Sequence, residues 1–137
     1  ISVMSNIIPG PIQRLTELLN EGNEAEADTL AAALAPLFGC VGVTTQEDTP
    51  YGKAECKARN PLAVKALMNV LGMPSGPTRR PLGKMTRQGI EVAVAAARQV
   101  QANDATVLAP IAAFFNVDIE ARLSDESLFE KLVYSTY

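Results

Sequence analysis

Hydrophobic residues recur at helical spacing along most of the chain, and polar or glycine residues bound each such stretch. From residue 11 to residue 20 the apolar positions fall on one face, and Gly22 is suited to end that helix in a left-handed conformation. A second pattern covers 24–38, where Asn23 and Glu26 resemble a capping box. The chain is therefore predicted to begin with two consecutive helices.

Helical periodicity returns in the second half of the chain, again with good capping residues. Asn60 is predicted to cap one helix, Thr86 a long one and Ser124 the last. The stretches with this period are 60–71, 86–101, 107–115 and 124–133. The fold class is therefore predicted to be mainly α.

Two stretches depart from the helical period. Residues 1–5 carry the apolar β-branched residues Ile1 and Val3 at alternate positions, which predicts the end of a buried parallel strand. A single strand leaves backbone groups unpaired on both edges, so it should pair with another chain, pack as coil or be disordered. Residues 40–59 are rich in polar and turn-forming residues, which predicts a long surface loop. Loops of that length are either functional or mobile, and mobility is favoured here.

Size and charge exclude several classes of protein. The 137 residues are enough to bury one core, and the net charge is −3 with the basic residues scattered. We expect no nucleic-acid partner, because no basic face is available to neutralise phosphates. No apolar run approaches the roughly 20 residues of a membrane-spanning helix, so we expect a soluble protein without a membrane partner.

The chain opens without a signal peptide, which favours a cytoplasmic location. Ile1 is not an initiator methionine, so we expect a piece of a longer protein. Cys40 and Cys56 are expected to be reduced thiols. No histidine is present, which excludes Ser-His and Cys-His nucleophile pairs and an ordinary zinc site. No metal site is predicted.

The most informative motifs are Asn60-Pro61, Val64-Lys65, Ser75-Gly76-Pro77 and Arg80-Pro81-Leu82, in that order and spacing. Together with the segment 1–6, they make the chain similar to the C-terminal part of the dihydrodipicolinate synthase / N-acetylneuraminate lyase family. The likeness covers about residues 1–102 and favours the dihydrodipicolinate synthase branch.

That resemblance implies an architecture. Members of the family are (β/α)8 barrels, so 1–22 would be the last strand and helix of such a barrel. Residues 23–102 would form the C-terminal helical domain, with an insertion at about 40–59. Residues 103–137 would be an additional helical tail. The resemblance also implies a homo-oligomer.

The resemblance further implies a chemistry. The intact enzyme would hold pyruvate as a Schiff base on a lysine and condense it with aspartate semialdehyde, in lysine biosynthesis and without a cofactor. Ile1 would place its backbone carbonyl beside the Schiff base as a substrate-binding residue. The family's reactive lysine has no counterpart here, so no catalytic residue is expected in the chain, and whether it acts as an enzyme alone stays open.

The remaining polar residues are weaker candidates. Arg79 and Arg80 either bind a carboxylate or anchor the connection around them to a helix, the second being favoured. Glu47 and Asp48 are expected to face solvent. The same holds for all five lysines: Lys53, Lys57, Lys65, Lys84 and Lys131.

Two alternatives remain open from the sequence. One is a free-standing helical interaction module that oligomerises through helix faces such as Ala27/Leu34 and Val94/Ala97. The other keeps the family but changes the substrate to a keto-deoxy sugar acid or sialic acid.

Overall fold

The computed structural model describes residues 2–136, and the chain is mainly helical, as predicted. Its helices are α1 (Pro9–Asn20), α2 (Glu24–Phe38), α3 (Leu62–Val70), α4 (Arg87–Asn103), α5 (Ala109–Phe115) and α6 (Ile119–Ser124). The strands are β1 (Val43–Thr49) and β2 (Gly52–Ala58). Short 3-10 turns cover Val3–Asn6, Gly39–Val41, Ala105–Val107 and Glu126–Phe129.

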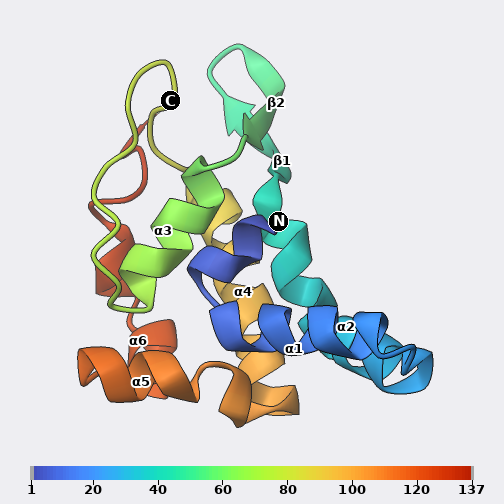
Figure 1. Cartoon of the computed structure of the whole chain (residues 1–137). Coiled ribbons are helices and arrows are strands. Elements are labelled where there is room, and N and C mark those ends of the chain that lie inside the picture. The colour runs from blue at the N-terminus through green and yellow to red at the C-terminus, as the bar shows by residue number, and fades with distance from the viewer. Residues whose placement is uncertain (1, 137) are drawn as a thin grey trace.

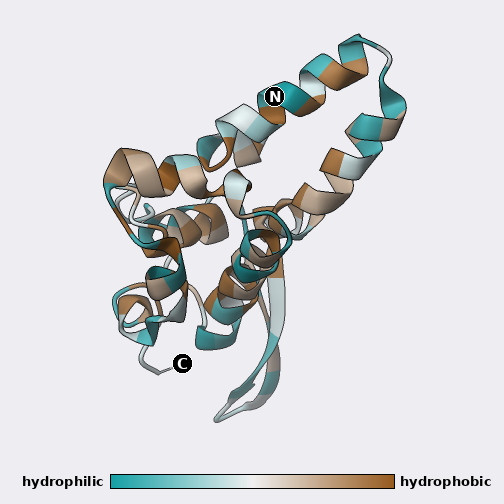
Figure 2. Ribbon diagram, turned by 90° about the horizontal axis from the view of Figure 1, so that it is seen from below, coloured by the Kyte–Doolittle hydropathy of each residue, from teal (hydrophilic) through white to brown (hydrophobic). Residues whose placement is uncertain are grey.

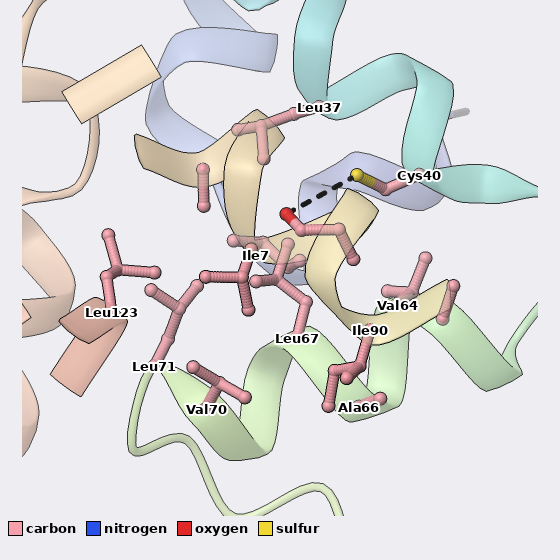
Figure 3. Packing of buried hydrophobic residues seen from close by; sticks show 14 of the residues in the cluster. Ile7, Leu37, Cys40, Val64, Ala66, Leu67, Val70, Leu71, Ile90 and Leu123 are labelled. Carbon is pink, nitrogen blue, oxygen red and sulfur yellow. Dashed lines mark hydrogen bonds between the residues drawn. The ribbon is translucent and has the colours of Figure 1, made fainter. Parts of the chain in front are cut away.

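Helix α4 lies at the centre, and α2, α3 and β1 all pack against it (Figure 1). Its inward face carries the small residues Ala93 and Ala97, which let neighbouring helices approach closely. Larger side chains from α2 and α3 fill the space around them (Figure 3). Helices α1 and α2 extend together from this body as an arm, and the two strands project as a separate ribbon (Figure 2).

The predicted strand at residues 1–5 is wrong for its described part, Ser2–Ser5. Val3–Asn6 is a 3-10 turn, in which the Ser2 hydroxyl accepts a bond from the Met4 N–H at 3.2 Å. The Ser5 hydroxyl donates to the Ser2 carbonyl at 2.6 Å. Without neighbouring strands the backbone satisfies its polar groups locally, and Met4 becomes fully buried.

The predicted loop at 40–59 is also wrong, because most of it forms an antiparallel hairpin. Val43 pairs with Ala58 and Thr49 with Gly52 at the turn. Alternate residues of β1 are buried, and those between them are exposed. The β-branched Val43, Thr44 and Thr45 carried this signal in the sequence, but the polar character of their neighbours concealed it.

Helix starts follow the sequence only in part. Thr86 caps α4 as predicted, since its hydroxyl accepts from the Gly89 N–H at 2.9 Å. Asn60 does not cap α3, which begins at Leu62 with Pro61 as the flanking residue. The capping box at Asn23 is not formed either, although α2 begins where predicted.

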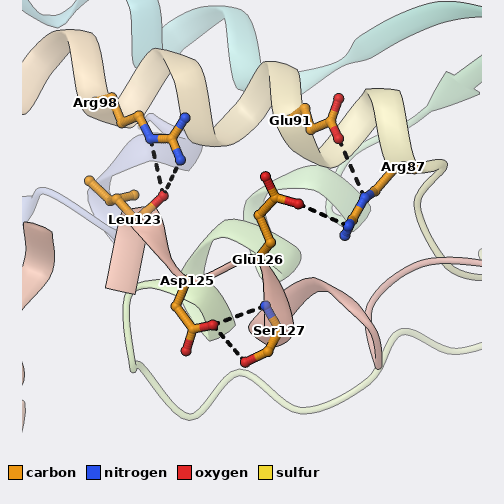
Figure 4. Close-up of polar contacts among 7 residues, drawn as sticks. All are labelled: Arg87, Glu91, Arg98, Leu123, Asp125, Glu126 and Ser127. Atoms are coloured by element: carbon orange, nitrogen blue, oxygen red, sulfur yellow. Dashed lines mark hydrogen bonds and ion pairs between the residues drawn. The ribbon is translucent and has the colours of Figure 1, made fainter. Parts of the chain in front are cut away.

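The predicted last helix at 124–133 is wrong. Ser124 ends α6, and Asp125 instead caps the 3-10 turn Glu126–Phe129 by accepting from the Ser127 N–H and hydroxyl at 2.9 and 2.6 Å. Two arginines of α4 face this segment (Figure 4). Arg98 donates to the Leu123 carbonyl through Nε at 3.0 Å, and Arg87 pairs with Glu126 at 3.2 Å.

The segment after α4 shares the central core. Phe129 is 2% exposed and its ring lies under the Arg87 guanidinium at 5.4 Å. Met85 and Val133 form a parallel bridge, with the Met85 N–H bonded to the Leu132 carbonyl at 3.0 Å. Residues 103–136 therefore add to the same hydrophobic cluster as the helices before them. Among residues 2–136, no helix is long and apolar enough to cross a membrane.

Candidate functional site

The one site residue that the sequence predicts, Ile1, lies outside the described residues. Val3 and Asn6, in the segment directly after it, line a cavity of about 460 Å³. Asn60, Pro61 and Ser75 line the same cavity. The structure thus brings together three motif segments that are far apart in the sequence.

Hydrogen bonds at this cavity fix the connection after α3 to the helix itself. The Ser75 hydroxyl donates to the Lys65 carbonyl at 2.7 Å, and Asn69 Nδ2 donates to Ser75 Oγ at 2.7 Å. The Lys65 ammonium donates to the Pro77 carbonyl at 2.9 Å. The motif residues Lys65, Ser75 and Pro77 therefore hold the polypeptide in place around α3.

No lysine occupies an enclosed position suited to imine chemistry. Lys65 is half-buried, and its ammonium is used by the Pro77 carbonyl. Four others are exposed: Lys53, Lys57, Lys84 and Lys131. A Schiff-base lysine needs desolvation or a neighbouring cation in a closed pocket to be deprotonated near neutral pH. None of the five is desolvated or enclosed in a closed pocket, because four are exposed and Lys65 is only half-buried.

A second cavity, of about 420 Å³, lies between the hairpin and the start of α4. Thr45 and Thr86 line it, and their hydroxyl oxygens are 3.3 Å apart. Thr45 also donates to Glu47 Oε1 at 2.7 Å. Because the single Thr45 proton is used by Glu47, Thr86 must donate to Thr45 while accepting from the Gly89 N–H.

Glu47 is 8% exposed, so the prediction that it faces solvent is wrong; Asp48, the next residue, is exposed as predicted. The period of two in β1 places Glu47 on the same inward face as Val43 and Thr45. This alternation was visible in the sequence, and sequence reasoning missed it because the segment was treated as a loop.

The two thiols occupy different environments. Cys40 is 1% exposed, and burial raises the pKa of its thiol to about 11. Its sulfur lies 3.9 Å from the Ala93 carbonyl oxygen, to which it donates a weak hydrogen bond (Figure 3). Cys56 is half-buried on β2 and lines the hairpin cavity. Both are free, in agreement with the expectation of reduced thiols.

Arg79 and Arg80 do not anchor their segment to a helix, so that prediction is wrong. Both are exposed, and neither forms a hydrogen bond or ion pair with another described residue. The anchoring bonds come instead from Lys65 and Asn69 on α3. Within residues 2–136, no group of three or more His, Cys, Asp or Glu side chains is placed to hold a metal ion.

Comparison with known proteins decides the family. Residues 1–100 match the dihydrodipicolinate synthetase family. The chain belongs to this family. The match ends near the C-terminus of α4, so it includes the hairpin and excludes α5 and α6. The predicted resemblance to this family over residues 1–102 is therefore confirmed for residues 1–100.

Several curated members of the family are similar to the chain. It is 32% identical over 88 residues to the 4-hydroxy-tetrahydrodipicolinate synthase of Methanococcoides burtonii, covering 64% of this chain and 25% of the relative. The enzyme of the same name from Acetivibrio thermocellus is 32% identical over 92 residues, covering 67% of this chain and 27% of the relative. The aligned part thus spans about a quarter of these relatives. No solved structure matches the chain.

Proposed function

We propose that the chain is the C-terminal portion of a dihydrodipicolinate synthase-like lyase. In the intact enzyme, pyruvate is held as a Schiff base on a lysine and condensed with aspartate semialdehyde in lysine biosynthesis. The observation that carries the proposal is the family match over residues 1–100, together with the synthase name that the two relatives described above share. In this proposal the reactive lysine belongs to the barrel that precedes the segment.

The role proposed for the segment itself is structural. This role is supported by the motif residues, whose hydrogen bonds attach the connection 74–85 to α3. They do not surround a buried amine. A second support is that every lysine is exposed or already bonded to a backbone carbonyl. The segment would close the barrel and contribute the helical domain against it.

Homo-oligomerisation is part of the proposal, but not through the helix faces that the sequence suggested. Ala27, Leu34, Val94 and Ala97 are each at most 1% exposed, because α2 packs against both α1 and α4 within one chain. These faces were therefore wrongly assigned to an interface, and nothing favours the free-standing interaction module. A homo-oligomer contact would use exposed apolar residues such as Phe114 on α5.

The proposal is tested by borohydride reduction of the complete parent protein in the presence of pyruvate, followed by peptide mapping. We expect a single reduced adduct on a lysine upstream of this segment, and condensation of pyruvate with aspartate semialdehyde in a steady-state assay. An adduct on any lysine between residues 53 and 131 would refute the structural role. Activity toward a keto-deoxy sugar acid without condensation would refute the substrate assignment.

A further inference from the structure

A third cavity, of about 650 Å³, lies between α3, the connection 74–85 and the C-terminal residues 131–135. Figure 1 shows these three segments side by side: α3 in green, the connection in yellow-green and the C-terminal segment in red. The Met85–Val133 bridge joins the last two beside the cavity. The size falls within the range of pockets that hold small molecules.

Four of the twelve basic residues of the chain line this cavity: Lys65, Arg80, Lys84 and Lys131. They come from three different parts of the fold, namely α3, the connection and the C-terminal segment. No Asp or Glu lines the cavity, although the chain has 15 acidic residues and a net charge of −3. The concentration of positive charge is therefore local and opposite in sign to the chain as a whole.

None of these four cations is neutralised by a carboxylate among the described residues. The ion pairs in residues 2–136 are made by Arg14 and Arg87 alone. Lys65 is held toward the connection by the Pro77 carbonyl, which carries no net charge. Arg80, Lys84 and Lys131 are exposed and make no hydrogen bond with another described residue.

The four positively charged side chains repel one another when no counter-ion is present, because they line the same cavity. An anion that reaches several of them at once relieves the repulsion and gains charge-assisted hydrogen bonds. The Arg80 guanidinium suits a planar, bidentate contact, and the lysines act as point charges. Tyr134 lies at the same wall, packed over Gly83, and adds an apolar face to the pocket.

We propose that this cavity binds a small, multiply charged oxyanion. Phosphate esters and polycarboxylates share the required chemistry, since both present several anionic oxygens within one small molecule. The inference goes beyond the proposed function and does not rest on it. The cavity at Asn60 and the hairpin cavity are lined by fewer basic side chains, so the inference is confined to this one.

The test is isothermal titration of the chain with inorganic pyrophosphate and, separately, with citrate, against sodium chloride of matched ionic strength. We expect saturable binding of at least one of the two anions and none of chloride. Binding of pyrophosphate alone assigns a phosphate-bearing ligand, and binding of citrate alone assigns a polycarboxylate. Absence of saturable binding in both titrations would overturn the proposal.

Variants locate the binding. Arg80→Gln combined with Lys131→Gln should weaken the affinity by about tenfold or more, because two charge-assisted contacts are removed. The matched control is Lys53→Gln with Arg59→Gln, which removes the same charge from exposed positions that do not line the cavity. We expect this control to retain the affinity within about twofold. An equal loss of affinity in the two double variants would mean that the anion is attracted non-specifically, and would overturn the proposal.

Thermal unfolding of each variant, followed by circular dichroism, shows whether a change in affinity comes from misfolding. Arg80 and Lys131 are exposed and unpaired within the described chain, so their substitution should leave the melting curve unchanged. If the double variant does not fold, Lys131→Gln alone serves, with Lys53→Gln as its control. A retained affinity in Lys131→Gln together with Lys84→Gln would also contradict the proposal.

Discussion

Arg122 Nε donates a hydrogen bond of 2.7 Å to the carbonyl of Val70, the last residue of α3. A second bond runs from Nη2 to the Asn69 carbonyl at 3.0 Å. The final carbonyls of a helix have no partner within the helix, and a cation there also suits the negative end of its dipole. A residue of α6, beyond the matched family region, thus completes a helix of the family motif.

Arg122→Met should destabilise the chain by about 1–2 kcal/mol, because it leaves two helix-end carbonyls without their charged donor. The methionine keeps much of the apolar stem, so the loss reports the hydrogen bonds. Urea unfolding measures it. Arg14→Met is the control, because Arg14 is half-exposed and its ion pairs at 3.7 and 3.8 Å should contribute less than about 0.5 kcal/mol. Equal effects would contradict the capping role.

Gly72 combines a positive φ with a crowded site, so a side chain should be costly there. Its φ is +88°, and an added Cβ would lie 2.9 Å from Val117 Cγ1 and 3.1 Å from Arg122 Nε. Gly72→Ala should therefore cost about 2–3 kcal/mol in thermal or urea unfolding, from backbone strain and displacement of Arg122. Gly22→Ala has a similar φ of +73° with no atom within 4 Å, so it should cost about 1 kcal/mol. A similar loss of unfolding free energy at both positions would show that the close contacts at Gly72 add nothing to the cost of the substitution.

Thr86 joins the hairpin to α4 and caps that helix. Thr86→Ala should destabilise the chain by about 1–2 kcal/mol, since the Gly89 N–H loses its acceptor and Thr45 its donor. Thr86→Ser keeps the hydroxyl and should recover most of that loss. Guanidinium unfolding of the three proteins measures both values. If serine were as damaging as alanine, the hydroxyl would not be the stabilising group.

Cys40 should make stability depend on pH in the alkaline range. Burial raises the pKa of its thiol from 9.0 to about 11, so the unfolded chain loses this proton first. The stabilising contribution is therefore fully present below pH 9 and is lost as pH rises toward 11. The free energy of unfolding of the wild type, relative to Cys40→Ala, should fall across this interval. A difference that stays constant with pH would contradict the burial of the thiol.

The same burial predicts a chemical difference between the thiols. Iodoacetamide at neutral pH should modify the half-buried Cys56 and reach Cys40 only after denaturation, because the thiolate is the reactive form. Mass spectrometry of the labelled peptides distinguishes the two. Modification of Cys40 in the native chain at the rate of Cys56 would show that the core around Ala93 opens.

The sequence predicted the helices whose apolar face is continuous, because their burial follows from periodicity alone. Helix α2 begins and ends where expected, and Thr86 caps α4 as expected. The prediction from the sequence failed where contacts with distant parts of the chain determine the local structure. The hairpin depends on pairing between residues such as Val43 and Ala58, fifteen positions apart. Val3–Asn6 forms a 3-10 turn because no strand of the described chain lies beside it to pair with.

The candidate sites were predictable to different extents. The family motif located the residues around Asn60 and Ser75, and the structure brings them together at one cavity. The basic cavity could not be predicted, because Lys65 and Lys131 meet only through the fold, and Glu47 required knowledge of strand alternation. Ile1 remains a prediction, since it lies outside the described residues.

The most direct test of the central claim is borohydride trapping of pyruvate on these 137 residues alone, read by intact-protein mass spectrometry. Our account places the imine-forming lysine outside the segment, so it predicts an unmodified mass after reduction. A covalent pyruvate adduct on this chain would contradict the account.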